Sequence, residues 1–95
     1  MKNQEIAKIF YDIADLLELT EEDFFKPRAY RKAAQSIESL NTDIEEYYKE
    51  NKLREIPGVG KAIEEKIKEL IRTGKSKYYE DLKKKIPIDL RILDI

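Results

Sequence analysis

The helical spacing of the apolar residues most constrains this chain, because only three Gly and three Pro interrupt it. In residues 3–19 apolar side chains recur every three or four positions, at Ile6, Ile9, Phe10, Ile13, Leu16 and Leu17. This spacing places them on one face of an α-helix. Similar spacing continues along most of the chain, so we expect an all-α fold, a compact bundle of short helices.

The size of the chain and its missing residue types limit its chemistry. Its 95 residues suffice for one domain. A domain of this size buries only about two-thirds of its extended surface, which leaves little room for a deep cofactor pocket. Cys and His are absent, which excludes disulfides, thiolate or imidazole metal sites and imidazole-based triads. Any catalysis must use Lys, Tyr or carboxylate side chains.

Targeting signals are missing as well. No apolar run approaches the ~20 residues of a membrane span, and residues 1–4 do not resemble a secretory signal. We therefore expect an intracellular protein without a membrane partner, in the cytoplasm or nucleoid, or in the nucleus of a eukaryote. We also expect a monomer.

Signals at helix ends divide the first half of the chain. Asn3 has a side chain suited to cap the first helix. Thr20 and Asp23 have the spacing that begins a turn or short helix. Pro27 suits the first turn of a second helix, which we expect to run to Leu40. Its inner stripe would contain Tyr30, Ala33, Ala34 and Ile37.

The middle of the chain predicts a third helix and then a helical hairpin. Thr42 and Glu45 have the capping-box spacing, which predicts a helix to about residue 50. Two helical pieces at 52–56 and 61–73 then flank a tight turn at residues 57–60.

The last quarter of the chain predicts one further helix. Gly74 follows the hairpin helix where a left-handed residue is usual, and Ser76 can begin a helix through residue 84. Pro87 would end that helix, and Asp89 can cap a final short one.

The strongest functional signal is Ile-Pro-Gly-Val-Gly at residues 56–60, followed by a helix with apolar residues at regular spacing. Gly58 and Gly60 lack Cβ atoms, so the backbone can turn with positive φ and approach a phosphate closely. The helix beside them directs free amide groups at that anion, while Val59 can point inward. The segment predicts a helix-hairpin-helix motif at about 52–73 that binds phosphates without reading bases. The alternative is an ordinary glycine-containing connection between helices.

The distribution of charge is compatible with an anionic partner. The net charge is −1, but residues 1–50 carry 7 basic and 12 acidic side chains, and residues 51–95 carry 12 and 8. Lys61, Lys68 and Arg72 are expected on the outer face of the hairpin helix, where they would supply charge to phosphates. The alternative is that these charges form the solvated faces of helices.

A second basic cluster precedes the hairpin. Lys26, Arg28, Arg31 and Lys32 lie around Tyr30 without an acidic neighbour, and they extend the expected phosphate track. A solvated helix face is the alternative. Tyr30 itself is expected to pack in the core, although its hydroxyl can reach a neighbouring pocket. The remaining paired tyrosines are interpreted as partly buried amphipathic residues rather than as platforms on which bases stack: Tyr47, Tyr48, Tyr78 and Tyr79.

Together, the hairpin and the segment Ala-Tyr-Arg-Lys-Ala-Ala at residues 29–34 resemble the amino-terminal domain of family X DNA polymerases of the beta type. The resemblance covers nearly the whole chain, and the Gly-Lys pair at 74–75 agrees with it. It implies that residues 1–86 bind gapped or nicked DNA on its 5′-phosphate side, for synthesis in base excision repair. It also implies that the nucleotidyltransferase site, with its divalent metals, belongs to a polymerase domain that this chain lacks.

The last residues suggest how such a domain would continue. Residues 93–95, Leu-Asp-Ile, parallel Arg-Glu-Ile at 54–56, just before the first hairpin turn. We therefore expect residues 87–95 to begin the linker to a second hairpin or fingers region.

The resemblance implies a second activity at Lys66. In the beta type the corresponding lysine forms a Schiff base with an abasic sugar before β-elimination. Helical geometry also places Lys66 at the edge of the buried stripe made by Ile63, Ile67, Leu70 and Ile71. Apolar surroundings, a helix start and nearby cations should lower its pKa, and a neutral amine is what imine formation needs. The alternative is a lysine that only contacts phosphate.

Other positions of the lyase pocket carry over unevenly. The resemblance assigns Tyr30, Lys26 and Glu65 to the pocket, with Glu65 as a proton acceptor. Ala62 replaces a phosphate-binding lysine, for which Lys61 can substitute, and Phe25 replaces a histidine that stacks on DNA.

The resemblance also implies a monovalent cation, Na⁺ or K⁺, in the hairpin. Backbone carbonyl groups would hold it, here those of Arg54, Ile56 and Val59. Side chains carry no signature of such a site.

Three functions remain open from the sequence. The first is a DNA-binding domain with lyase activity, and the second is a helix-hairpin-helix module that binds DNA without catalysis. The third is a helical protein-interaction domain, which the acidic first half favours. The first two predict affinity that falls steeply with salt.

Overall fold

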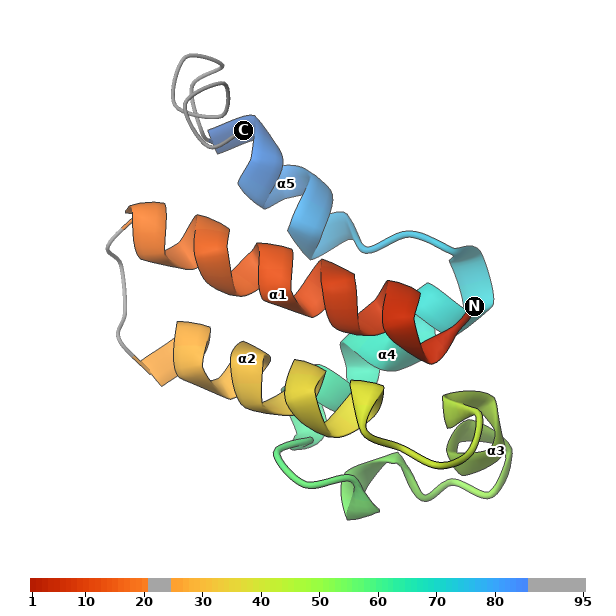
Figure 1. Cartoon of the computed structure of the whole chain (residues 1–95). Coiled ribbons are helices and arrows are strands. Elements are labelled where there is room, and N and C mark those ends of the chain that lie inside the picture. The colour runs from red at the N-terminus through yellow and green to blue at the C-terminus, as the bar shows by residue number, and fades with distance from the viewer. Residues whose placement is uncertain (21–24, 86–95) are drawn as a thin grey trace.

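The computed structural model describes residues 1–20 and 25–85, and over these ranges the protein is all-α, as predicted. Helices α1 (Asn3–Thr20) and α2 (Phe25–Glu38) lie side by side and antiparallel (Figure 1). They are followed by α3 (Ile44–Lys49), the 3₁₀ turn η1 (Leu53–Glu55), α4 (Lys61–Thr73) and α5 (Lys77–Lys85). None of the helices in these ranges has the length and apolar character needed to cross a bilayer.

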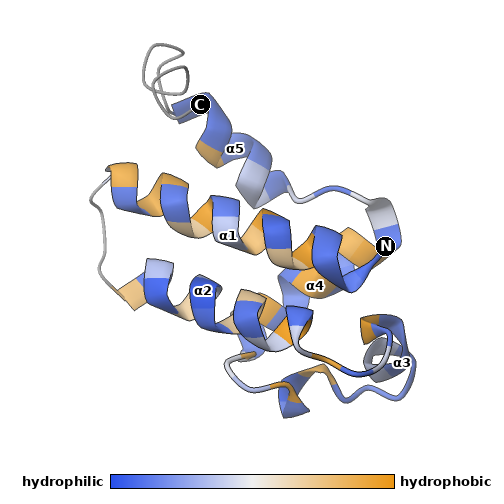
Figure 2. Ribbon diagram, in the orientation of Figure 1, coloured by the Kyte–Doolittle hydropathy of each residue, from blue (hydrophilic) through white to orange (hydrophobic). Residues whose placement is uncertain are grey.

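One apolar cluster joins all of these elements. Along α1, apolar residues alternate with hydrophilic ones, as the spacing predicted (Figure 2). Each helix buries at least one apolar side chain in the shared core, including Phe10, Ile37, Ile44, Leu53, Ile67 and Leu82. Because the core is continuous, it fixes the hairpin, α4 and α5 relative to α1 and α2.

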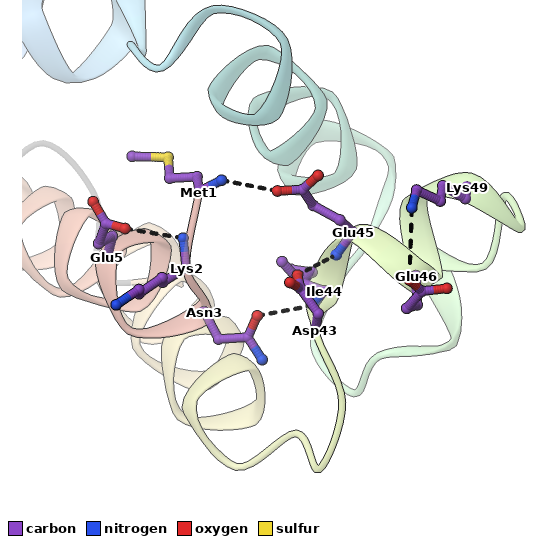
Figure 3. A network of polar contacts seen from close by, with 9 residues as sticks. All are labelled: Met1, Lys2, Asn3, Glu5, Asp43, Ile44, Glu45, Glu46 and Lys49. Carbon is purple, nitrogen blue, oxygen red and sulfur yellow. Dashed lines mark hydrogen bonds and ion pairs between the residues drawn. The ribbon is translucent and has the colours of Figure 1, made fainter.

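The caps of the first and third helices differ from the prediction. Asn3 does not cap α1, because its side-chain amide donates to the Thr42 carbonyl and its oxygen accepts from the Ile44 amide, both at 2.8 Å. Asp43 rather than Thr42 caps α3, accepting from the Glu45 amide at 2.9 Å (Figure 3). Thr42 therefore contributes its backbone carbonyl and not a side-chain cap, and Asn3 connects α1 to the start of α3 by hydrogen bonds.

A different pair of contacts supports the start of α1. The Glu5 carboxylate accepts from the Lys2 amide at 3.0 Å and satisfies a donor that the helix leaves unpaired. The Met1 amino group pairs with Glu45 of α3 at 2.8 Å (Figure 3). Both contacts strengthen the junction between α1 and α3.

The remaining boundaries follow the prediction within a few residues. Pro27 lies in the first turn of α2, which ends at Glu38, two residues before the expected Leu40. Gly74 is left-handed with φ +76° and donates to the Leu70 carbonyl at 2.8 Å. The Ser76 hydroxyl accepts from the Tyr79 amide at 3.2 Å at the start of α5. The predictions that involve Asp23, Pro87, Asp89 and the linker at 87–95 lie outside the described residues.

The hairpin turn is a type II β-turn. The Val59 amide donates to the Ile56 carbonyl at 3.0 Å, Pro57 occupies the second position, and Gly58 has φ +85°. The side chains of Ile56 and Val59 are buried on either side of the turn, as predicted for Val59. Gly60 is extended with φ −95°, so the prediction of positive φ was wrong there. One left-handed residue completes the turn, and Gly60 instead occupies the N-cap position of α4, without a side chain to bond the first amides.

Gly58 is also the point where the turn packs on α2. A Cβ atom at Gly58 would lie 3.0 Å from Cγ of Lys32 and 3.4 Å from the Ala33 nitrogen. A Cβ atom at Gly60 would meet nothing within 4 Å. The fold therefore requires Gly58, whereas Gly60 leaves open space in front of α4.

The two glycines should differ in their effect on stability. We expect Gly58→Ala to lower the free energy of unfolding by about 1–2 kcal/mol or more, because a side chain at positive φ is strained. Gly60→Ala should change it by less than about 0.5 kcal/mol. Urea denaturation followed by circular dichroism measures both, and equal losses would contradict this account of the turn.

Candidate nucleic-acid interface

A cavity of about 550 Å³ lies where α2, the hairpin turn, α4 and α5 meet. We call it the lysine pocket; the described residues that line it are Lys26, Ala29, Tyr30, Gly58, Gly60, Lys61, Ala62, Ile63, Lys66 and Tyr78. Three of these are lysines, and none is a carboxylate. The pocket therefore combines an apolar lining with positive charge from two helices.

The amino end of α4 opens into the lysine pocket. The first hydrogen bond of this helix runs from the Glu64 amide to the Gly60 carbonyl, at 2.8 Å. The amide groups at residues 61–63 precede it and have no acceptor within the helix. Gly60 has no side chain to cap them, and both Gly60 and Lys61 are exposed. The hairpin thus leaves these amides open at the pocket, where the sequence predicted contact with a phosphate.

Lys66 extends from α4 into the pocket and is half-buried. Its Nζ atom lies 4.7 Å from the centre of the Tyr78 ring. Burial lowers the pKa of the Lys66 amine; nearby Glu69 opposes this shift, and Lys26 adds to it. A lowered pKa agrees with the prediction made from the position of Lys66 at the edge of the apolar stripe.

Tyr30 belongs to both the core and the pocket. Only 6% of its surface is exposed, and its ring packs edge-on against Phe10 with centroids 5.6 Å apart. The Tyr30 ring also stacks on the Tyr78 ring, with centroids 6.0 Å apart and an interplanar angle of 16°. Burial raises the pKa of Tyr30, so the phenol stays neutral. The prediction of core packing is confirmed, and the ring forms a wall of the pocket as well.

Sequence reasoning missed the role of Tyr78. It is partly buried, as interpreted, but it also lines the pocket beside Lys66. Its place depends on α5 folding back across the domain (Figure 1). No local pattern around residue 78 indicates that arrangement.

The structure does not place Glu65 or Lys68 in the lysine pocket. The Lys68 ammonium lies 3.9 Å from Glu65 and 4.0 Å from Glu64. Glu64 is buried and also accepts from Arg54 at 3.2 Å. Helical spacing explains the first two pairs, because residues three and four apart share a face. Lys68 therefore faces two carboxylates of its own helix and lies outside the described lining of the pocket.

The basic residues of α2 likewise differ in whether they line the lysine pocket or pair with carboxylates. Arg31 donates to Glu18 and, at 2.9 Å, to Asp15, both on α1. These two carboxylates raise the pKa of the guanidinium and direct it at α1. Lys26 lines the pocket, while Arg28 and Lys32 are exposed beside it. The Phe25 side chain is 79% exposed.

The hairpin carbonyls suit the expected cation in one respect. Among the described residues, the Ile56 carbonyl accepts one turn hydrogen bond, from the Val59 amide at 3.0 Å. A carbonyl oxygen has two lone pairs, so one remains for a cation. Among the described residues, no group of three or more carboxylates is placed to hold a metal ion. The backbone oxygens of Arg54, Ile56 and Val59 remain the predicted ligands.

Comparison with known proteins identifies the class that this fold and hairpin define. Residues 1–76 match the model of a helix-hairpin-helix domain, and the chain belongs to this family. It is 33% identical over 87 residues to the DNA polymerase/3′-5′ exonuclease PolX of Bacillus subtilis (strain 168). The match covers 92% of this chain and 15% of that protein. The predicted resemblance to a family X polymerase domain is confirmed, and the chain spans a small part of that relative's length.

Lys66 should be distinguished by its reactivity. Because burial lowers its pKa, we expect amine-directed labelling of Lys66 to reach its plateau at a lower pH than labelling of exposed lysines. Trace reductive methylation across a pH series, read by peptide mass spectrometry, measures this. Lys68 belongs to the same helix and is also partly buried, so it serves as a matched control for access of the reagent. A profile for Lys66 that coincides with the exposed lysines would contradict the prediction.

Proposed function

We propose that this domain binds DNA through the sugar-phosphate backbone at the lysine pocket, without sequence preference. The main support is one observation: Lys26, Lys61 and Lys66 line the same cavity as the start of α4, where no side chain caps the helix. Lysines act as point charges on phosphates, and helix amides donate to the same oxygens. Such contacts position a nucleic acid but do not read bases. Membership of the helix-hairpin-helix family supports this function.

We propose that the preferred form is gapped or nicked DNA with a 5′-phosphate. The pocket is concave, and its volume of about 550 Å³ falls in the range of about 300–1,000 Å³ typical of small-ligand sites. A terminal sugar-phosphate can enter such a cavity, whereas an unbroken strand can only pass across its mouth. The similarity to PolX supports a role in which a longer family X polymerase uses this domain to hold a gap during base excision repair.

Binding should depend on the strand end and on the pocket. We expect gapped DNA with a 5′-phosphate to bind more tightly than the same gap with a 5′-hydroxyl, and both more tightly than intact duplex. Lys26→Ala and Lys61→Ala should each weaken binding and reduce the slope of log affinity against log salt by about 1. Fluorescence anisotropy over a salt series measures affinity and slope. Lys49→Ala on α3, outside the pocket, is the matched charge control.

The Gly60→Leu variant tests whether DNA binds at the hairpin or at another surface of the protein. Because the space beyond Gly60 is open, the fold should persist while the new side chain obstructs the amides of α4. We expect a large loss of DNA affinity. Unchanged affinity would point to another surface, or to the protein-interaction role that the acidic first half favoured.

We further propose lyase chemistry at Lys66. Its neutral amine adds to the C1′ aldehyde of a ring-opened abasic sugar and loses water to form an imine. Removal of a C2′ proton then breaks the C3′–O bond, and the DNA leaves with its own 5′-phosphate. Water hydrolyses the remaining imine and regenerates the amine. The lowered pKa of Lys66 supports the first step.

The route of the C2′ proton differs from the one that the resemblance implied. Glu65 was the expected acceptor, but it is exposed and faces Lys68. None of the described residues that line the pocket is a carboxylate. We therefore propose that water accepts this proton, with Tyr30 serving as a wall for the sugar.

Borohydride trapping tests the lyase proposal. With a 5′-deoxyribose-phosphate substrate, reduction should link the protein covalently to DNA, and Lys66→Ala should abolish the adduct. Lys68→Ala should leave it intact, because its charge is held by Glu64 and Glu65 outside the pocket. Absence of any adduct, or an adduct that survives Lys66→Ala, would leave a DNA-binding module without catalysis. The loss of a lysine at Ala62 is the observation that favours this second function.

We propose that a monovalent cation, Na⁺ or K⁺, binds the carbonyl oxygens of Arg54, Ile56 and Val59. When bound, it would add positive charge beside the hairpin. The spare lone pair of the Ile56 carbonyl supports this role.

A further inference from the structure

One wall of the lysine pocket comes from α5, which follows the hairpin. Tyr78 lies in the first turn of this helix. Its ring stacks on Tyr30 at 6.0 Å, and its centre lies 4.7 Å from the Lys66 ammonium. Three helices thus meet at Lys66, since Tyr30 belongs to α2 and Lys66 to α4.

Contacts outside the pocket hold Tyr78 in place. The neighbouring Tyr79 hydroxyl donates to Asp12 of α1 at 2.9 Å, and burial together with this bond raises the pKa of Tyr79 to about 12. Leu82, one turn further along α5, is buried in the core. The docking of α5 on α1 therefore positions Tyr78 through contacts that do not involve Lys66.

The Tyr78 ring has two opposing effects on the amine. It covers the amine from water, which disfavours the charged form. Its π face attracts the ammonium, which favours that form. The titratable groups around Lys66 come from each neighbouring helix: Lys26 and Tyr30 of α2, Lys61 and Glu69 of α4, and Tyr78 of α5.

We propose that Tyr78 is a positioning residue for Lys66: the Tyr78 ring covers the amine from water and holds it by its π face in the lysine pocket. Its use in catalysis rests on the proposed lyase function. The contact itself belongs to the protein without DNA. Tyr78 would act on the substrate only through Lys66.

The two effects of the ring can be separated by substitution. Tyr78→Ala removes both cover and attraction; since burial is the largest influence on Lys66, its pKa should rise toward the ordinary lysine value. Tyr78→Leu keeps cover but removes the π face, so the pKa should fall below that of the unmodified protein. Tyr78→Phe keeps both and should leave the pKa unchanged.

Side-chain NMR of isotopically labelled lysine, titrated with pH, measures these shifts without DNA. A Lys66→Arg variant identifies the signal. Opposite shifts in the alanine and leucine variants, with no shift in the phenylalanine variant, are the expected result. If neither variant shifts the pKa of Lys66, the ring has no effect on the amine and the proposal is overturned. Shifts of the same sign in both variants would also overturn it, because loosened packing alone would explain them.

Two further measurements keep this proposal separate from the proposed function. Thermal unfolding shows whether the variants are folded; the leucine and phenylalanine variants retain a large side chain and carry the test if Tyr78→Ala unfolds. Anisotropy with gapped DNA and borohydride trapping report on the proposed function. If the NMR shifts are as expected but no adduct forms, only the lyase function fails. If an adduct forms without those shifts, only the role of Tyr78 fails.

Discussion

The close packing of the hairpin turn on α2 is the constraint from which the site follows. At Gly58 the backbone is left-handed and lies so near Lys32 and Ala33 that any Cβ atom would crowd them. This contact brings α2, with Lys26 and Tyr30, against the start of α4. If the turn were displaced, the lysines would lie on separate surfaces and the pocket would be lost. The conformation and close packing of Gly58 are therefore required by the fold itself.

Ion pairs within the protein decide which of its many charges are available. A net charge of −1 gives no indication of a positive site. Arg31 pairs with two carboxylates of α1, and the Lys68 ammonium lies within 4.0 Å of two carboxylates of α4. The pocket lysines have no carboxylate among their described lining neighbours. Three lysines therefore gather at one cavity in a chain with almost balanced charge, while Arg31 and Lys68 pair with carboxylates elsewhere.

Much of the fold could be predicted because its signals are local. The helices, the turn at Gly58 and the left-handed Gly74 depend on residues close in sequence, and they were found close to where the pattern indicated. The caps at Asn3 and Thr42 were predicted wrongly because long-range contacts compete with local ones. Asn3 bonds across to the amide of Ile44, which leaves Asp43 as the residue free to cap α3. Gly60 was assigned an unneeded positive φ, since one left-handed residue completes the turn.

By itself, the amino-acid sequence determined the helical architecture, the glycine turn and the candidate lysine, because spacing and backbone preferences act over a few residues. Only the tertiary structure decided which candidates share a pocket. Tyr78 joined Lys66 there because α5 docks on α1 through Tyr79 and Leu82. Such choices depend on side chains far apart in the chain, whose burial and pairing are settled when the helices pack together.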